Sequence, residues 1–128
     1  MKQSLYIIKV SSKFSSAHAL RHYQGKCESL HGHNFNVEAE VEGKELDTQT
    51  GLLMDFSELK DLLNQIVEYL DHGHLNEKSP FDTINPSSEN ISCYIYQELQ
   101  KKLQDYQLSV RAVSVSENEN SKAVYMEQ

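Results

Sequence analysis

The stretch Cys27–Val41, which reads CESLHGHNFNVEAEV, places reactive side chains directly before the clearest strand pattern in the chain. In its second half, apolar and polar residues alternate, which is the period of a strand with one buried face. The apolar members of this strand are Phe35, Val37, Ala39 and Val41. His31 and His33 have the same parity as Phe35, so an unbroken strand turns both imidazoles toward the buried face. Gly32 could instead interrupt the register between them.

Two imidazoles on one face of a strand provide two ligands for a metal ion. His18, which follows an upstream apolar run, offers a third. Three neutral imidazoles without a fourth protein ligand are typical of a catalytic zinc site, because the open position accepts water or substrate. Cys27 lies four residues before His31 and strengthens the metal interpretation. The alternative is that these histidines are surface or core side chains with satisfied hydrogen bonds.

Composition limits the classes of function. A length of 128 residues suggests one domain, residues 1–128. The net charge of −7 argues against a broad nucleic-acid surface. No apolar stretch reaches the ~20 residues that span a membrane, and the run Leu5–Ile8 is too short for a signal peptide. Cys27 and Cys93 could form one disulfide, but a reduced, cytoplasmic protein is the simpler interpretation.

The remaining periodicities predict an α+β fold. Strands are predicted over residues 5–14, 34–41, 108–117 and 122–126, with a strand end at residues 51–54. A first helix follows Asp55, which is predicted as its N-cap, with Glu58 completing a capping box. A second helix opens at residues 85–90, where Pro and Ser are typical of a helix start. We expect an antiparallel four-stranded sheet with both helices packed on one face.

The face of the sheet away from the helices also needs a cover. Tyr6, Ile8 and the valines near the C-terminus have little else in the chain to pack against. Exposed apolar surface of this kind favours a homo-oligomer.

Asp71 and His72 are adjacent at the end of the first predicted helix. An aspartate beside a histidine suggests acid/base chemistry, although Asp71 could equally be a helix cap or an ion-pair partner. His74 could be a spare metal ligand, and the alternative is a loop histidine near solvent.

Two glutamates stand at structurally informative positions. Glu117 has the parity of Val113 and Val115, so its carboxylate points where apolar side chains point and needs a partner there. The alternative is that the strand ends earlier and Glu117 is solvated. Glu89 falls in the first turn of the second helix, where the helix dipole favours a negative charge.

Taken in order, these motifs resemble the 6-pyruvoyltetrahydropterin synthase and 6-carboxytetrahydropterin synthase family, which has the tunnelling fold. The resemblance covers nearly the whole chain. The matching segments are FSSAH (14–18), CESLHGHN (27–34), LMDF (53–56), LDH (70–72), NPSSEN (85–90) and VSVSE (113–117). Two positions depart from the family pattern, since Asn118 and Ser87 stand where the family usually or often has threonine.

The resemblance implies a role for each group. It implies Zn²⁺ held by His18, His31 and His33, with Cys27 as the catalytic cysteine and Asp71 and His72 as an acid/base pair. It implies that Glu117 anchors the pterin ring and that Ser88 and Glu89 lie near the pterin pocket. It also implies trimers that pair into hexamers, with active sites between subunits.

The implied reaction is that of a carbon–carbon lyase of queuosine biosynthesis. A 6-carboxytetrahydropterin synthase converts 7,8-dihydroneopterin triphosphate to the 6-carboxy product, triphosphate and acetaldehyde. The alternatives are a 6-pyruvoyltetrahydropterin synthase and a non-catalytic pterin- or zinc-binding module. The spacing of Cys27 fits both synthases, while Cys27 itself argues against relatives that cleave dihydroneopterin-type side chains and place a glutamate in this neighbourhood.

Overall fold

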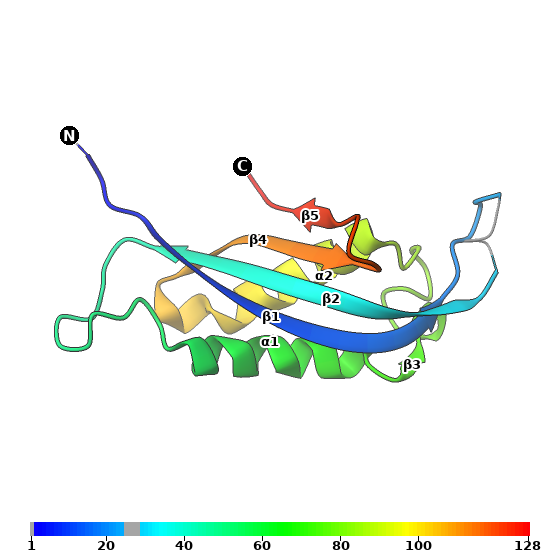
Figure 1. Cartoon of the computed structure of the whole chain (residues 1–128), viewed down its shortest axis with the longest axis horizontal. Coiled ribbons are helices and arrows are strands. Elements are labelled where there is room, and N and C mark those ends of the chain that lie inside the picture. Colours follow the sequence, from blue (N-terminus) through cyan, green and yellow to red (C-terminus); the bar gives the residue numbers. More distant parts are fainter. Residues whose placement is uncertain (1, 25–28) are drawn as a thin grey trace.

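Two long strands, β1 (Tyr6–His18) and β2 (His31–Gly43), form an antiparallel hairpin that runs the length of the molecule (Figure 1). The computed structural model describes residues 2–24 and 29–128. Phe14 pairs with Phe35 and His18 with His31. β1 therefore extends four residues beyond the predicted end at residue 14, and β2 begins three residues before the predicted start at residue 34. Gly32 stays within the ladder, so the predicted register is unbroken.

The sheet has five strands in the order β3-β1-β2-β4-β5. β4 (Ser109–Ser116) and β5 (Ala123–Tyr125) continue the antiparallel pattern. The two-residue strand β3 (Gly73–His74) pairs in parallel with β1 and makes the sheet mixed. A pair of residues carries no alternation, so sequence periodicity predicts four strands and misses this one. Residues 51–54 form no strand and bend at 53–54 before the first helix, whereas a strand end was predicted there.

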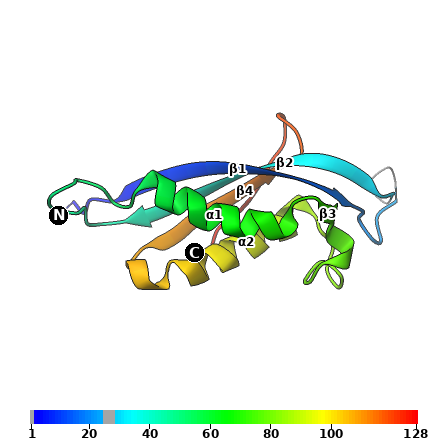
Figure 2. The same ribbon diagram turned by 90° about the horizontal axis from the view of Figure 1, so that it is seen from below.

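The helices α1 (Phe56–Leu70) and α2 (Ser88–Lys102) cover one face of the sheet (Figure 2). Their apolar stripes meet the inward-facing residues of β1, β2 and β4 in one core. This core includes Leu59, Leu63, Leu70, Ile91, Ile95, Leu99, Phe14, Phe35, Val113 and Val115. The α+β fold with both helices on one face is therefore confirmed. Across the described residues, none of the helices has the length and apolarity needed to cross a membrane.

Both helix starts are capped by side chains. Asp55 caps α1 by accepting a hydrogen bond from the Ser57 backbone N–H at 2.8 Å. Glu58 accepts a hydrogen bond from the Tyr106 hydroxyl at 2.7 Å, so this tertiary contact replaces the predicted capping box. Ser87 caps α2, which begins at Ser88.

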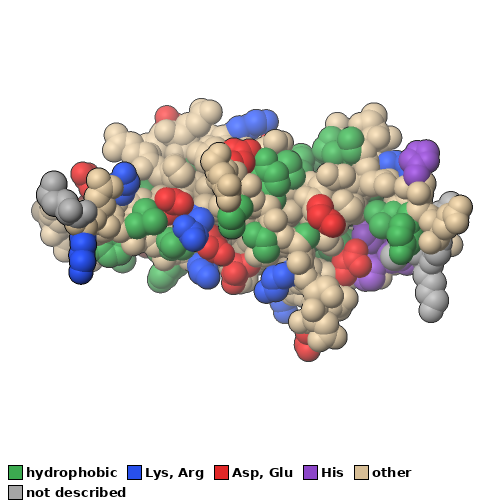
Figure 3. Space-filling view, turned by 90° about the horizontal axis from the view of Figure 1, so that it is seen from above, with side chains coloured by type: hydrophobic (Ala, Val, Ile, Leu, Met, Phe, Trp, Pro, Cys, Tyr) green, Lys and Arg blue, Asp and Glu red, His purple; other side chains and the backbone are tan. Residues whose placement is uncertain are grey.

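The sheet face away from the helices is polar. Lys9 and Arg111 both form ion pairs with Glu40 there. Figure 3 shows acidic and basic side chains interleaved on the side of the molecule opposite to that seen in Figure 2. The prediction that Ile8 and the valines near the C-terminus lack packing partners fails for Ile8, which packs against the core, and for the valines of β4, which are buried under the helices. Tyr6 and Val124 do expose apolar surface, at 42% and 51%.

Candidate metal centre and active site

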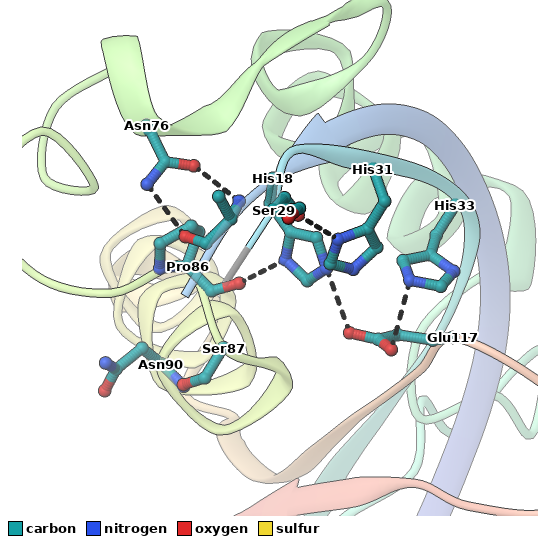
Figure 4. Close-up of polar contacts among 10 residues, drawn as sticks. His18, Ser29, His31, His33, Asn76, Pro86, Ser87, Asn90 and Glu117 are labelled. Carbon is teal, nitrogen blue, oxygen red and sulfur yellow. Dashed lines mark hydrogen bonds and ion pairs between the residues drawn. The ribbon is translucent and has the colours of Figure 1, made fainter. Parts of the chain in front are cut away.

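Three histidines meet at one end of the hairpin (Figure 4). His18 is the last residue of β1, while His31 and His33 lie at the start of β2. The antiparallel register sets His18 opposite His31 and Ser16 opposite His33, so all three imidazoles leave from the helix-covered face. One nitrogen from each ring lies within 4.8 Å of the other two. The pairing of β1 with β2 and the alternation of side chains along each strand account for this convergence.

Backbone carbonyls determine which ring nitrogens are free. His18 Nδ1 lies 2.6 Å from the Pro86 carbonyl oxygen, and His31 Nδ1 lies 2.7 Å from that of Ser29. A carbonyl can only accept, so Nδ1 carries the proton in both rings. The lone pair of each Nε2 is then available to a ligand. This is the second-sphere arrangement found around metal-binding histidines.

The cluster fits a metal ion. His18 is 1% exposed, and no polar atom among the described residues forms a hydrogen bond with its Nε2. A buried nitrogen without a partner is costly, and a metal bound at Nε2 would satisfy it. Burial holds the pKa of His18 below its ordinary value, against the opposing effects of the Pro86 carbonyl and the charge of Glu117. The neutral imidazole favoured by burial is the form that binds metals.

Glu117 follows the last residue of β4 and faces the histidine cluster. Its Oε1 lies 3.2 Å from His18 Nε2 and its Oε2 lies 3.3 Å from His33 Nε2. The contact with His18 is within ion-pair range but is not aligned as a hydrogen bond. The carboxylate thus points inward, as the parity of β4 predicts, and faces two of the candidate metal ligands.

Asp71 and His72 form a close pair on the adjoining turn. The Asp71 Oδ2 atom lies 2.7 Å from His72 Nδ1, and Oδ1 accepts the Ser15 backbone N–H at 2.8 Å. This hydrogen bond from Ser15 and the contact with His72 hold the pKa of Asp71 below its ordinary value. His72 has a φ of +53°, and its side chain is 83% exposed. Asp71 is also the C-cap of α1, so the interpretation as a helix cap or ion-pair partner describes the structure, and the acid/base role stays a prediction.

Two surface hollows flank the cluster. His33 and His72 line one of them, together with Ser15 and Asn34. Glu117 lines the other, together with Ser88 and Glu89. The structure therefore places His72 in a hollow that includes His33, and the candidate pterin-binding residues in a separate hollow that includes Glu117.

Two other sequence candidates remain, and the structure places one of them. Cys27 falls outside the described residues. His74, suggested as a spare ligand, lies 3.3 Å from Glu77 and does not join the cluster. Conversely, the sequence gives no sign of the Pro86 carbonyl as partner of His18. The motif containing Pro86 indicates only a helix start, because a backbone acceptor leaves no mark in the residue type.

Comparisons with known proteins agree with this geometry. The family model described as 6-pyruvoyl tetrahydropterin synthase matches residues 7–128. A protein of Archaeoglobus fulgidus, provisionally named 6-carboxy-5,6,7,8-tetrahydropterin synthase, is 43% identical over 114 residues, which cover 89% of this chain and 90% of the relative. A dihydroneopterin monophosphate aldolase of Pyrococcus furiosus is 37% identical over 92 residues, or 72% and 73% of the two chains.

Among solved structures, the 6-pyruvoyl tetrahydropterin synthase of Caenorhabditis elegans superposes with a TM-score of 0.85. The match covers 100% of this chain and 99% of that one at 22% identity. At this identity the likeness establishes the fold alone.

Proposed function

Because the chain belongs to the 6-pyruvoyl tetrahydropterin synthase family, we propose that it is a zinc-dependent 6-carboxy-5,6,7,8-tetrahydropterin synthase. Residues 1–128 would act as one catalytic domain. The observation that carries the proposal is the buried Nε2 of His18, which has no hydrogen-bond partner among the described residues and lies with two further imidazoles beside Glu117. The choice of the 6-carboxy product rests on the 43% identity to the archaeal relative.

His18, His31 and His33 would hold the zinc ion. When bound, zinc would act as a Lewis acid on the side-chain oxygens of 7,8-dihydroneopterin triphosphate. The carbonyls of Pro86 and Ser29 keep the protons of His18 and His31 on Nδ1, so both rings present Nε2 without reorganisation.

Glu117 would anchor the pterin ring by accepting hydrogen bonds from its guanidine-like edge, with Ser88 and Glu89 lining the same hollow. Its carboxylate lies beside the imidazole nitrogens, so a ring held there places its side chain next to the metal centre. The position of Glu117 therefore links substrate orientation to the metal ligands.

His72 would move a proton at its Nε2. The Asp71 carboxylate accepts the Nδ1 proton at 2.7 Å, which fixes the tautomer and leaves Nε2 free in the open hollow beside His33. Cys27 would act as the thiolate that removes a proton from the substrate side chain, a role assigned from the sequence.

The same family likeness leads us to propose a cytoplasmic enzyme of queuosine biosynthesis that assembles as trimers paired into hexamers. The exposed side chains of Val124 on the edge strand β5 and of Tyr6 at the start of β1 support burial of sheet edges between subunits.

Mass spectrometry of the products of the zinc-loaded protein with 7,8-dihydroneopterin triphosphate tests the proposal. We expect 6-carboxytetrahydropterin and acetaldehyde, and their loss in Cys27→Ala and His33→Ala. The matched control is His74→Ala, which removes a histidine outside the cluster and should remain active. Accumulation of 6-pyruvoyltetrahydropterin would reassign the reaction within the same site. Release of a two-carbon aldehyde that still carries the triphosphate would instead favour an aldolase, and no turnover would favour a binding module.

A further inference from the structure

The three residues after His18 leave the sheet and pair with side chains in place of a strand. The Ala19 N–H donates to Asn76 Oδ1 and the Ala19 carbonyl accepts from Asn76 Nδ2, both at 2.9 Å. The Arg21 N–H and carbonyl form the same two bonds with the amide of Asn85, both at 2.8 Å. These four hydrogen bonds attach the end of β1 to the segment 76–85.

This pattern continues the hydrogen bonding of β1 beyond the short strand β3. Residues 15, 19 and 21 have the same parity, so their backbone groups leave from one edge of an extended chain. Along that edge, the Ser15 carbonyl accepts a hydrogen bond from the His72 N–H. Further along, the backbone groups of Ala19 and Arg21 bond to the side chains of the two asparagines. A primary amide offers one acceptor and two donor hydrogens in one plane, so asparagine can replace a backbone partner.

The second asparagine directly precedes the residue that orients His18. Asn85 is followed by Pro86, whose carbonyl accepts the His18 Nδ1 proton. The Asn85 carbonyl in turn accepts a hydrogen bond from the Asn90 side chain in α2 at 2.8 Å. The Arg21 guanidinium donates to the carbonyls of Asn76, Phe81 and Ile84 and holds the segment against β1. Hydrogen bonds thus hold the segment that carries the acceptor of His18 against both the end of β1 and helix α2.

We propose that Asn76 and Asn85 are positioning residues that fix the His18 ring and the Pro86 carbonyl relative to each other, so that Nε2 faces the metal site. The inference rests on the proposed function, because it assumes that His18 is a metal ligand. The outer partners of a ligand set its orientation, and their loss typically lowers metal affinity about 10–100-fold.

The experiment measures binding of Zn²⁺ alone to the metal-free full-length chain, by competition with a chromophoric chelator. Asn76→Ala and Asn85→Ala should bind Zn²⁺ about 10–100-fold more weakly than the unmodified protein. The matched control is Thr83→Ala, which removes a side-chain hydrogen bond to Pro80 in the same segment and should bind within about twofold. Asn76→Asp and Asn85→Asp keep the acceptor oxygen but lose the donor. If the alanine variants do not fold, the Zn²⁺ affinity of these aspartate variants tests the proposal in their place.

A second readout distinguishes positioning from general destabilisation. Co²⁺ bound in place of Zn²⁺ reports ligand geometry through its visible absorption, which a merely less stable protein would leave unchanged once folded and loaded. We expect altered band positions or intensities in the asparagine variants and an unchanged spectrum in Thr83→Ala. Wild-type affinity and spectrum in the asparagine variants would overturn the positioning role alone. Failure of the unmodified protein to bind either ion would overturn both this role and the proposed metal centre.

Discussion

Zinc should stabilise the folded protein by an amount that depends on all three histidines. An ion that binds only the folded state stabilises it by RT ln(1 + [L]/Kd), or ~2.7 kcal/mol at 100 times Kd. A chain of this size should show a rise in Tm of ~3–5 °C per kcal/mol, and hence ~8–14 °C. His33 is half-buried with 27% of its side chain exposed, so truncation to alanine should perturb the metal-free fold little while removing one ligand.

The assay is thermal unfolding with and without Zn²⁺ for the unmodified protein, His33→Ala and His74→Ala. We expect the full rise in the unmodified protein and in His74→Ala, and most of it to be lost in His33→Ala. His74 is a suitable control because it is a partly exposed histidine paired with Glu77 outside the cluster. Equal rises in all three proteins would refute the reasoning, because zinc would then bind elsewhere.

Three further predictions address single contacts. Glu117→Gln should lower kcat/KM about 10–100-fold, as expected for loss of a charged hydrogen-bond acceptor, while Glu119→Gln, on the exposed turn, should not; steady-state kinetics measures both. Asp71→Asn should weaken the fall in the free energy of unfolding at acid pH. The pKa of Asp71 in the folded protein lies below the ordinary 3.8, so its contribution to stability is complete above that value. The contribution is lost as the pH falls through the folded pKa. Urea unfolding at several pH values measures this, and identical pH dependence in Asp71→Asn and the unmodified protein would contradict it. Ser87→Ala should lower the free energy of unfolding by about 1 kcal/mol through loss of the α2 cap, and an unchanged urea midpoint would refute that role.

The parity of His31 and His33 could be predicted because a strand has a period of two and its buried face is marked by Phe35 and its neighbours. The extension of β1 to His18 could not, because Ser11, Ser12, Ser15 and Ser16 interrupt the apolar alternation. The pairing with β2 holds that segment in the sheet despite its polar composition. Sequence patterns thus located the three candidate ligands and the face shared by His31 and His33, but not the full length of the strand that carries His18.

The other features that could not be predicted from the sequence depend on contacts between distant segments. The direction of Glu117 follows from the parity of β4, but its partners depend on β4 pairing with β2. The capping box at Glu58 is lost to Tyr106, and β3 forms where the His72 N–H donates to the Ser15 carbonyl at 2.7 Å. Such contacts join residues far apart in the chain and leave no local pattern to read.

The arrangement also explains how one fold can serve relatives named for different reactions. The three candidate ligands lie on the paired strands β1 and β2, where a shift of register would separate His18 from His31 and His33. The candidate acid/base pair Asp71 and His72 lies instead on a turn after α1, and Cys27 lies between the two strands in sequence. Turns change more readily than paired strands. Metal binding should therefore tolerate changes at Asp71, His72 and Cys27, whereas the identity of the product should be sensitive to them.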